Sequence, residues 1–229
     1  MSRTDCHFKD RRDAGRQLAT GLMKYRDQNP LILALPRGGV PVAFEIAERL
    51  QAELDVLFVR KIGAPGHPEY GIGAVVDGAH PQTVLNEEIV RQLAVSPAYI
   101  QDQTARELRE IERRRAVYQG GRAPAEIAGR TVIMVDDGIA TGGTVRAALQ
   151  GLKLGKPARL VLAVPVAPPE AIDALRSEAD EIVCLATPDP FYAVGLHYDD
   201  FRQTEDEEVV RLLADAASWR HDRQPQRRV

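Results

Sequence analysis

The sequence predicts an α/β protein with a parallel sheet that helices cover on both faces. Two observations lead to this prediction. Short runs that are almost entirely apolar, such as Leu31 to Leu35 and Thr131 to Val135, alternate along the chain with longer segments of helical periodicity. A strand without a polar face must be buried on both sides, and this is the usual situation of a strand in a parallel sheet flanked by helices.

The helices are predicted from apolar residues that recur every three or four positions. In the first helix, residues 10–27, Ala14 and Leu18 belong to such a stripe, and the helix ends before Pro30. The further helices are expected at residues 42–50, 87–118 with a break at Ser96-Pro97, 143–154, 169–176 and 205–217.

The strands are predicted from short apolar runs bounded by turn residues. The strands of the main sheet are expected at residues 31–35, 56–59, 131–135, 160–164 and 182–185. A smaller pair of strands is expected around residues 72–76 and 83–85. The segment 62–73, which is rich in glycine and proline, is expected to form a flexible loop before and into this pair.

The length of 229 residues suits a single domain, which we place at residues 1–220. We expect this domain to carry a helical insertion at about 87–118 and a C-terminal hood, in which aromatic residues gather, at about 186–203. The basic tail 221–229 is expected to be disordered. The arginine run 113–115 is expected to lie on a solvated helix face.

Charge and composition narrow the class of partners. The net charge is −3 at pH 7, which gives no broad basic surface for a nucleic acid. No run approaches the roughly 18 apolar residues that cross a bilayer, and the N-terminus lacks the apolar core of a signal peptide. Cys6 and Cys184 belong to no metal-binding or disulfide pattern. We therefore expect a cytoplasmic protein with reduced thiols and no nucleic-acid or membrane partner.

Three polar loops are expected to meet at one edge of the main sheet. Residues 36–39, 60–71 and 136–144 each follow a predicted strand. In an open parallel sheet, ligands bind beyond the carboxyl ends of the strands. These loops are therefore the candidate binding site.

The loop 136–144 combines two acids with a turn that suits a phosphate. Glycines, hydroxyls and the open amides of a helix start follow one another from Gly138 to Thr144. Asp136 and Asp137 would repel a bare phosphate, but carboxylates suit a ribose diol or a hydrated Mg²⁺ ion. The loop therefore predicts a ribose 5-phosphate site; the alternative is a capped helix beside two solvated acids. It has neither a Walker ending nor the GxGxxG of dinucleotide-binding proteins.

The stretch TVIMVDDGIATGGT, residues 131–144, resembles the signature of the type I phosphoribosyltransferases, which bind phosphoribosyl pyrophosphate (PRPP). The resemblance extends over roughly residues 10–200 and is greatest to a bacterial group without an assigned acceptor. It implies a Rossmann-like parallel-sheet core, a flexible loop and a hood. The residues it assigns to PRPP are Asp136 and Asp137 for the diol and Mg²⁺, and Ala140, Thr141, Gly142, Gly143 and Thr144 for the 5′ phosphate.

The loop from Leu35 to Gly39 resembles the pyrophosphate loop of the same family. The amides of Gly38 and Gly39 and the guanidinium of Arg37 can bind a diphosphate, the arginine in a bidentate manner. Members of the family often have a cis peptide bond between non-proline residues in this loop, and by position the bond that enters Arg37 is the candidate. The alternative is a plain strand-to-helix turn.

The remaining loop resembles the flexible loop of adenine phosphoribosyltransferases. Arg60-Lys61 is similar to their Arg-Lys pair, in which two positive charges would stabilise the leaving pyrophosphate; the alternative is surface charge. The run 68–71 is similar to their Glu-Tyr-Gly, so Glu69 is a candidate acid or base toward the nucleobase, or else only orders the loop. Ala140 stands where hypoxanthine-guanine enzymes carry an aspartate, which argues against that subgroup.

These assignments predict Mg²⁺-dependent transfer of the 5-phosphoribosyl group between PRPP and a nitrogenous base, with release of pyrophosphate. The candidate catalytic residues are Glu69, Lys61 and Asp137, the last because a carboxylate near C1′ favours positive charge on the ribose. The alternatives are a regulator that senses PRPP without transfer and a hydrolase of PRPP or a nucleotide. The acceptor is not identified, and hood aromatics such as Tyr192 and Tyr198 can stack on a base or only pack the hood. A homodimer is common among relatives.

Overall fold

The computed structural model describes residues 7–221, with side chains up to Trp219 in the last helix. Cys6 lies outside the described residues. The same is true of residues 222–229, so the disorder expected for the basic tail lies outside the described residues except at His221, where the expectation is wrong because this residue ends the last helix.

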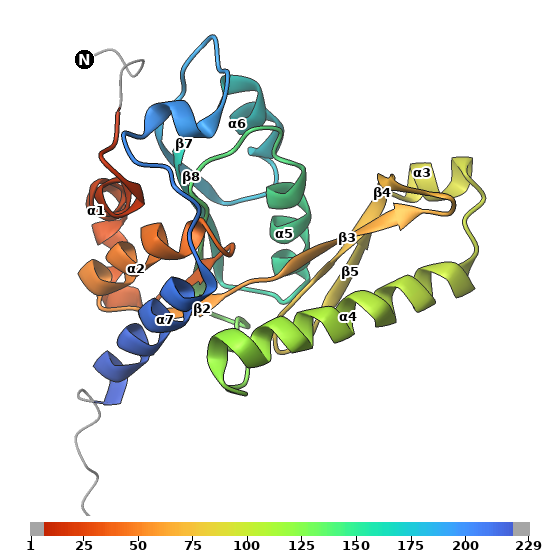
Figure 1. Ribbon diagram of the computed structural model, residues 1–229, viewed down its shortest axis with the longest axis horizontal. Helices are drawn as coiled ribbons and strands as arrows, with labels where there is room; N and C mark the ends of the chain where they lie inside the picture. The colour runs from red at the N-terminus through yellow and green to blue at the C-terminus, as the bar shows by residue number, and fades with distance from the viewer. Residues whose placement is uncertain (1–6, 222–229) are drawn as a thin grey trace, which may run out of the picture.

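A five-stranded sheet forms the centre of the molecule, in the strand order β2-β1-β6-β7-β8. Every neighbouring pair in this sheet is parallel, which confirms the predicted fold class (Figure 1). The strands are β1 (Leu31–Ala34), β2 (Glu53–Val56), β6 (Thr131–Val135), β7 (Arg159–Val166) and β8 (Glu181–Ala186).

Helices cover both faces of the five-stranded sheet (Figure 1). The first face carries α1 (Arg11–Leu22), the 3₁₀ helix η1 (Met23–Gln28) and α2 (Gly39–Leu50), and the second carries α5 (Gly143–Leu154) and α6 (Pro169–Leu175). Successive strand residues point to opposite faces. Ile32 and Ala34 of β1 accordingly belong to the core beneath α1 and α2. Leu31 and Leu33 belong to the core beneath α5 and α6.

The segment after β2 forms a second, antiparallel sheet in the order β3-β4-β5. Its strands are β3 (Val59–Ala64), β4 (His67–Val76) and β5 (Gln82–Leu85). Residues 62–73, for which a loop is expected, therefore form most of a β-hairpin that projects from the core (Figure 1). Pro65 and Gly66 make its two-residue turn, in which Gly66 has φ +73°, and this pair of residues is typical of a type II turn.

The expected strand at 56–59 is wrong, because the apolar run spans the boundary between the two sheets. Val56 ends β2 and Val59 begins β3. Leu57 and Phe58 between them are buried. Burial of the connection, and not a continuous strand, therefore accounts for the unbroken apolar run.

Two helices follow the second sheet, at the position of the expected insertion. They are α3 (Glu87–Gln92) and α4 (Pro97–Gln119), and the break between them lies where it is predicted. The Ser96 side chain accepts a hydrogen bond from the backbone N–H of Tyr99 at 3.2 Å, and Pro97 takes the first helical position. Helix α4 packs along the second sheet and against the last helix of the chain (Figure 1).

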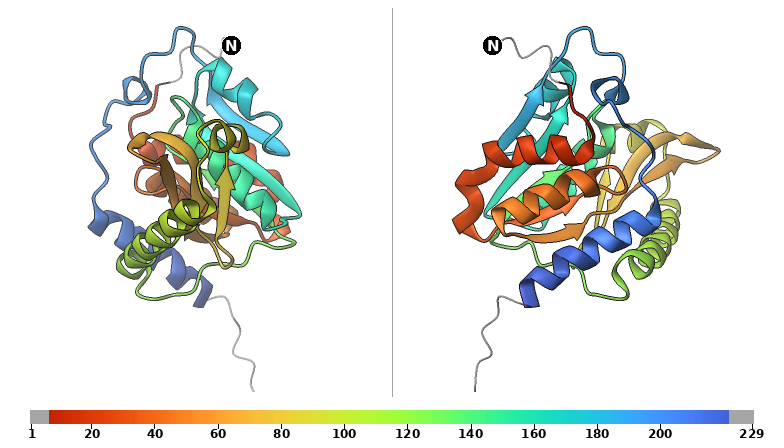
Figure 2. Two further views of the ribbon diagram at one scale, coloured as in Figure 1. Left: turned by 90° about the vertical axis from the view of Figure 1, so that its right-hand side faces the viewer. Right: turned by 60° about the vertical axis from the view of Figure 1, so that its left-hand side comes forward.

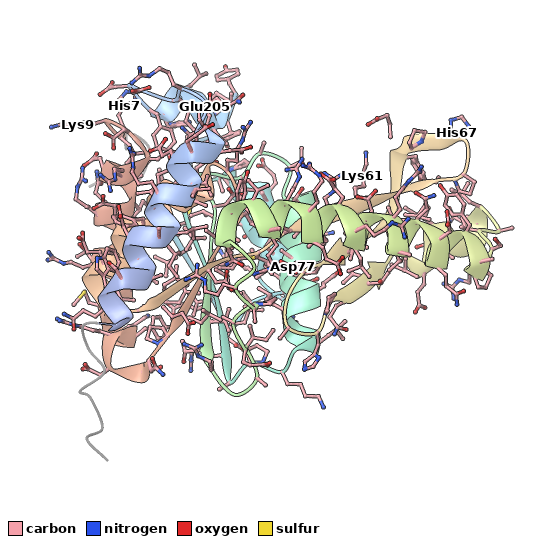
Figure 3. All side chains as sticks on the ribbon, turned by 60° about the horizontal axis from the view of Figure 1, so that its bottom comes forward. His7, Lys9, Lys61, His67, Asp77 and Glu205 are labelled. Atoms are coloured by element: carbon pink, nitrogen blue, oxygen red, sulfur yellow. The ribbon has the colours of Figure 1, made fainter. Side chains whose placement is uncertain are left out.

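The expectation of a solvated arginine run is wrong for Arg115, although Arg113 and Arg114 do lie at the surface and pair with Glu110. The Arg115 side chain is only 10% exposed. It forms an ion pair with Asp77, at the end of β4, and donates to the carbonyl oxygen of Val56 at 3.2 Å. Figure 3 labels Asp77 close to α4.

The C-terminal part of the chain returns along the core. After β8 come η2 (Val194–His197) and α7 (Asp206–His221), and α7 lies against α2 and α4 (Figure 2). The N-terminal segment pairs with this return: the backbone N–H of Phe8 donates to His197 at 2.9 Å, and that of Asp199 donates to Phe8 at 2.8 Å. Within residues 7–221, no helix combines the length and apolar character needed to cross a membrane.

Candidate active site

The loops that follow β1 and β6 lie side by side at the carboxyl edge of the sheet. Ala34 is opposite Val135 in the parallel pairing, so both loops begin at the same level. A Cβ atom on Gly38 would lie 2.0 Å from Oδ2 of Asp137, and one on Gly39 would lie 2.8 Å from the carbonyl oxygen of Val135. Glycine at both positions therefore allows the candidate pyrophosphate loop to touch the acid pair.

The peptide bond between Pro36 and Arg37 is cis, which confirms the prediction for the bond that enters Arg37. The Arg37 side chain extends toward α7, where Nη1 lies 3.5 Å from Oδ1 of Asp206. The hydroxyl of Tyr118 donates to the same oxygen at 2.6 Å. Burial, together with this acceptor, raises the pKa of Tyr118 to about 12. The Arg37 side chain is 34% exposed, so an anion can reach it.

Asp136 and Asp137 follow β6 directly and form the acid pair. The backbone N–H of Asp137 donates to Oδ1 of Asp136 at 2.9 Å. Burial raises the pKa of both carboxyl groups, and the charge of Asp137 raises that of Asp136 further. A carboxylate that has lost water gains from hydroxyl donors or a cation. The pair is therefore suited to a ribose diol or a metal ion.

The glycine-threonine turn opens onto solvent at the start of α5. Gly142 precedes the helix with φ +76°, a left-handed conformation that favours glycine. No side chain caps this helix, and its first amides have no intrahelical partner. Ala140, Thr141, Gly143 and Thr144 are exposed. The amides, the hydroxyls and the positive end of the helix dipole are thus accessible to a phosphate.

A cavity of about 670 Å³ connects this turn with the second sheet. Thr141, Gly143 and Thr144 line one side of it, and Lys61 of β3 and Gly71 of β4 line the other. The fold therefore brings Lys61 to the cavity of the phosphate turn.

Arg60 does not accompany Lys61, because neighbouring strand residues point to opposite faces. Arg60 pairs with Glu107 of α4 at 2.8 Å. Lys61 instead places its Nζ 3.3 Å from Oε2 of Glu69 and 3.1 Å from the Glu69 carbonyl oxygen. Figure 3 labels Lys61 on the hairpin. The two cations expected at one pyrophosphate thus lie on opposite faces of β3.

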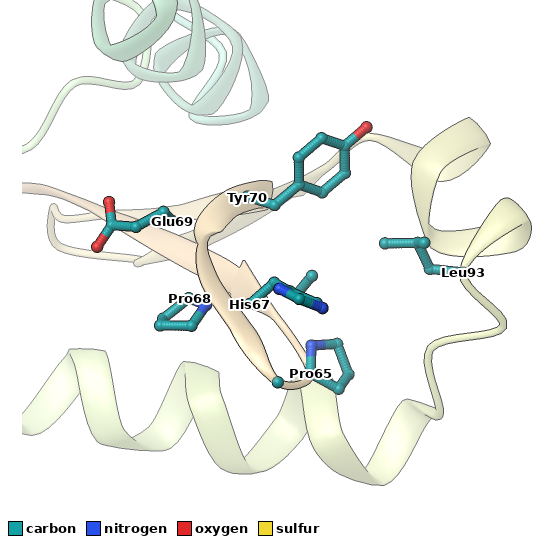
Figure 4. Close-up of a pocket in the computed structure, with 8 residues that line it drawn as sticks. Pro65, His67, Pro68, Glu69, Tyr70 and Leu93 are labelled. Atoms are coloured by element: carbon teal, nitrogen blue, oxygen red, sulfur yellow. The ribbon is translucent and has the colours of Figure 1, made fainter.

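Glu69 and Tyr70 lie close to the hairpin tip, where a second cavity of about 700 Å³ opens. The ring of Tyr70 and the side chain of Leu93 are half exposed on one side of this cavity. The Glu69 carboxylate points away from both of them (Figure 4). Its contact with Lys61 relates Glu69 to the cavity of the phosphate turn.

The two tyrosines of the hood differ in exposure. Tyr198 is buried, its ring lies 5.3 Å from that of Phe8, and its hydroxyl donates to the carbonyl oxygen of Asp137 at 2.6 Å. Of the two interpretations of these aromatics, packing therefore applies to Tyr198. Tyr192 is 79% exposed and accessible to a ligand.

The structure adds Arg11 to the site, a residue that the sequence analysis does not identify. Its Nε donates to Oδ2 of Asp137 at 2.7 Å. Arg11 precedes Asp137 by 126 positions and belongs to a helix with two other arginines, Arg12 and Arg16. No local pattern distinguishes it, and only the fold brings the two side chains together.

The acid pair fits a metal ion that arrives with a ligand. Within residues 7–221, no group of three or more His, Cys, Asp or Glu side chains could hold a metal ion. Mg²⁺ commonly binds through one or two carboxylates together with phosphate oxygens and water. The donor set of Asp136 and Asp137 matches that mode and does not form a protein-only cage.

The fold and the two loops define an α/β protein with a candidate binding site at the carboxyl edge of a parallel sheet. The chain belongs to the phosphoribosyl transferase family, because the family model of the phosphoribosyl transferase domain matches residues 9–200. The family resemblance predicted from residues 131–144 is thereby confirmed.

Relatives of known sequence or known structure resemble most of this chain. Rv0571c of Mycobacterium tuberculosis strain H37Rv, named only provisionally as a phosphoribosyl transferase, is 46% identical over 206 residues, which are 90% of this chain and 46% of Rv0571c. The chain thus spans about half the length of these curated relatives. The crystal structure of TT1426 from Thermus thermophilus has a TM-score of 0.80 and 44% identity, over 91% of this chain and 98% of TT1426.

A shorter match covers only a small part of this chain. The pyrimidine operon regulatory protein of Lactococcus lactis subsp. lactis strain IL1403 is 57% identical over 42 residues, which are 18% of this chain and 24% of that protein.

Proposed function

We propose that this protein transfers the 5-phosphoribosyl group between PRPP and a nitrogenous base, with release of pyrophosphate and a requirement for Mg²⁺. One observation carries the proposal: a partly buried acid pair, an open glycine-threonine turn and a glycine loop that touches Asp137 share one edge of the sheet. They suit, in turn, the diol, the 5′ phosphate and the pyrophosphate of PRPP. A ligand with a single phosphate would use only one of them.

The sugar phosphate is held by the two ends of the loop 136–144. The amides and hydroxyls from Ala140 to Thr144 bind the 5′ phosphate at the positive end of the α5 dipole. Asp136 and Asp137 accept hydrogen bonds from the 2′ and 3′ hydroxyls. Bonds to charged groups contribute about 1.5–3 kcal/mol each. Together these contacts fix C1′ in front of the pyrophosphate loop.

The pyrophosphate lies against Arg37 and Gly38, and Lys61 approaches it from β3. The expected contact with the amide of Gly39 is wrong, because Gly39 is buried and its N–H donates to the carbonyl oxygen of Leu35 at 3.0 Å. Lys61 must leave Glu69 to do so, but an exposed ion pair is worth no more than about 1 kcal/mol. Arg60 is already paired with Glu107, so we assign the larger role to Lys61. Positive charge here stabilises the negative charge that grows on the leaving group. When bound, Mg²⁺ would neutralise part of the same charge.

Cleavage at C1′ leaves positive charge on the ribose, which the carboxylate of Asp137 would stabilise. A nitrogen of the acceptor base then attacks from the opposite side, with inversion. We assign Glu69 the role of acid or base toward this acceptor, since it lies beside Lys61. In this proposal the hairpin closes over the site and excludes water, which favours transfer over hydrolysis.

A regulator that binds PRPP without transfer is the second candidate. The observation that favours it is the 42-residue match to a protein named for a pyrimidine operon. The 97% exposure of the Glu69 side chain also fits a protein whose hairpin does not close. A PRPP hydrolase is the third candidate. All three share the PRPP site and differ in the step that follows binding.

Release of pyrophosphate from PRPP separates the three functions. The chain is incubated with PRPP and Mg²⁺, with and without a panel of purine and pyrimidine bases. A transferase releases pyrophosphate only when its base is present, a hydrolase releases it without any base, and a regulator binds PRPP and releases none. Binding of PRPP without release for any base would therefore contradict the proposed transfer.

Lys61→Ala is expected to lower the base-dependent rate about 100-fold, because the growing charge of the leaving group loses a donor. The rate of pyrophosphate release measures this effect. Lys153→Ala is the matched control, since Lys153 pairs with Glu178 in a similarly exposed ion pair. Equal rates for Lys61→Ala and Lys153→Ala would show that Lys61 does not act in the site.

A further inference from the structure

Arg11 forms a partly buried ion pair with the acid pair. Its Nε lies 2.7 Å from Oδ2 of Asp137, and the two side chains are 11% and 16% exposed. The neighbouring Arg12 differs, because it pairs with Glu45 and is 44% exposed. Arg11, the first residue of α1, therefore faces the acid pair and not the solvent.

Two further contacts hold the Arg11 guanidinium in place. Nη1 donates to the backbone carbonyl of Arg202 at 2.7 Å. The guanidinium also lies over the ring of Phe201, 3.9 Å from the ring centroid, in a cation–π arrangement. Both partners belong to the hood. Arg11 therefore joins the hood to the acid pair in one fixed geometry.

Asp137 is restrained on its other sides as well. The hydroxyl of Tyr198 donates to its carbonyl oxygen at 2.6 Å, and its N–H donates to Asp136. Its carboxylate lies against Gly38, where a Cβ atom would have no room. The Asp137 carboxylate consequently touches both Arg11 and the pyrophosphate loop.

The net charge of Arg11, Asp136 and Asp137 decides whether an anion can approach these three side chains. Asp136 and Asp137 together carry two negative charges, and PRPP is itself a polyanion. With Arg11 in contact, the three side chains sum to one negative charge. A cation in a site that is largely shielded from water acts strongly on nearby charges.

We propose that Arg11 is a positioning residue for the ribose diol: it orients the Asp137 carboxylate and offsets one charge of the acid pair, so that PRPP binds there. This inference rests on the proposed function. It predicts that, without Arg11, the acid pair repels the ligand and depends more on Mg²⁺ to shield it.

The test is calorimetry of PRPP binding over a series of Mg²⁺ concentrations. Arg11→Ala is expected to weaken PRPP binding at low Mg²⁺ by roughly tenfold or more, since removal of one partner leaves a buried charge uncompensated. The loss should shrink as Mg²⁺ rises. Arg11→Lys retains the charge but not the forked contact to Asp137 and Arg202, and it should recover part of the affinity.

Arg12→Ala on the same helix is the control, and its PRPP affinity and Mg²⁺ dependence should equal those of the unchanged protein. If Arg11→Ala does not fold, as judged by thermal unfolding, Arg11→Lys alone decides, with weakened binding at low Mg²⁺ expected. Equal or tighter binding, or an unchanged Mg²⁺ dependence, would overturn the positioning role. Absence of PRPP binding by the unchanged protein would instead overturn the proposed function, and this inference with it.

Discussion

Replacing Asp136 and Asp137 together by asparagine is expected to weaken PRPP binding by at least about 100-fold, because two charge-assisted hydrogen bonds of about 1.5–3 kcal/mol each are lost. Asparagine keeps the shape of the side chain but not its charge. The dissociation constant from calorimetry measures the loss. Of the single changes, Asp136→Asn should have the larger effect, since Arg11 already binds Asp137.

For Asp136, whose carboxylate does not share the ion pair of Arg11 with Asp137, the direction of the pKa shift argues that the loss is not a folding defect. Burial raises the pKa of both carboxyl groups, so their charged forms cost stability at neutral pH. Asp136→Asn should therefore leave the unfolding temperature unchanged or raise it. Asp173→Asn, in an exposed ion pair with Arg176, is the control and should bind PRPP normally. Undiminished binding by the double variant would show that the diol lies elsewhere.

Arg115→Ala is expected to lower the free energy of unfolding by about 3–5 kcal/mol, because it leaves buried carboxylates without their partner. Arg115 contacts both Asp77 and Asp55, whose side chains are 4% and 5% exposed. Burial already raises the pKa of Asp77, and Arg115 opposes that rise. Urea unfolding monitored by circular dichroism measures the change.

Arg113→Ala is the control for that measurement. Its side chain is 66% exposed and pairs across the surface of α4 with Glu110, so its removal should change stability by no more than about 0.5 kcal/mol. Equal stability of the two variants would mean that α4 does not depend on its buried arginine. Arg115 also anchors the helix that packs on β3, the strand of Lys61. Weakened Lys61-dependent activity in Arg115→Ala would accordingly be a secondary effect.

The strands of the main sheet can be predicted because strands that are buried on both faces are short, continuous apolar runs in the sequence. Thr131 to Val135 is buried throughout and forms β6 as expected. The same apolar pattern wrongly predicts a strand at Val56 to Val59, because a buried connection between two sheets is as apolar as a strand. The glycines and prolines of residues 62–73 predict a loop instead of the hairpin. In the structure they supply the turn and the irregular pairing.

Two kinds of reasoning predict part of the candidate site. One is the chemistry of residues that are close together in the sequence, and the other is the rule that ligands bind at the carboxyl edge of a parallel sheet. They bring the loops after β1 and β6 together, whereas the cis bond before Arg37 is implied only by the family resemblance. Contacts between distant segments left no such signal. The ion pair of Arg11 with Asp137 and the burial of Arg115 depend on how helices pack. The separation of Arg60 from Lys61 follows from strand alternation, once residues 59–64 are known to be a strand.

The central claim is that a sugar 5-phosphate binds between the acid pair and the start of α5. A crystal structure of the protein with ribose 5-phosphate tests it most directly. The account predicts the phosphate on the amides between Thr141 and Thr144, with the ribose hydroxyls in hydrogen-bond contact with Asp136 and Asp137. A structure in which the sugar phosphate is bound at another place, while this turn holds only solvent, would contradict it.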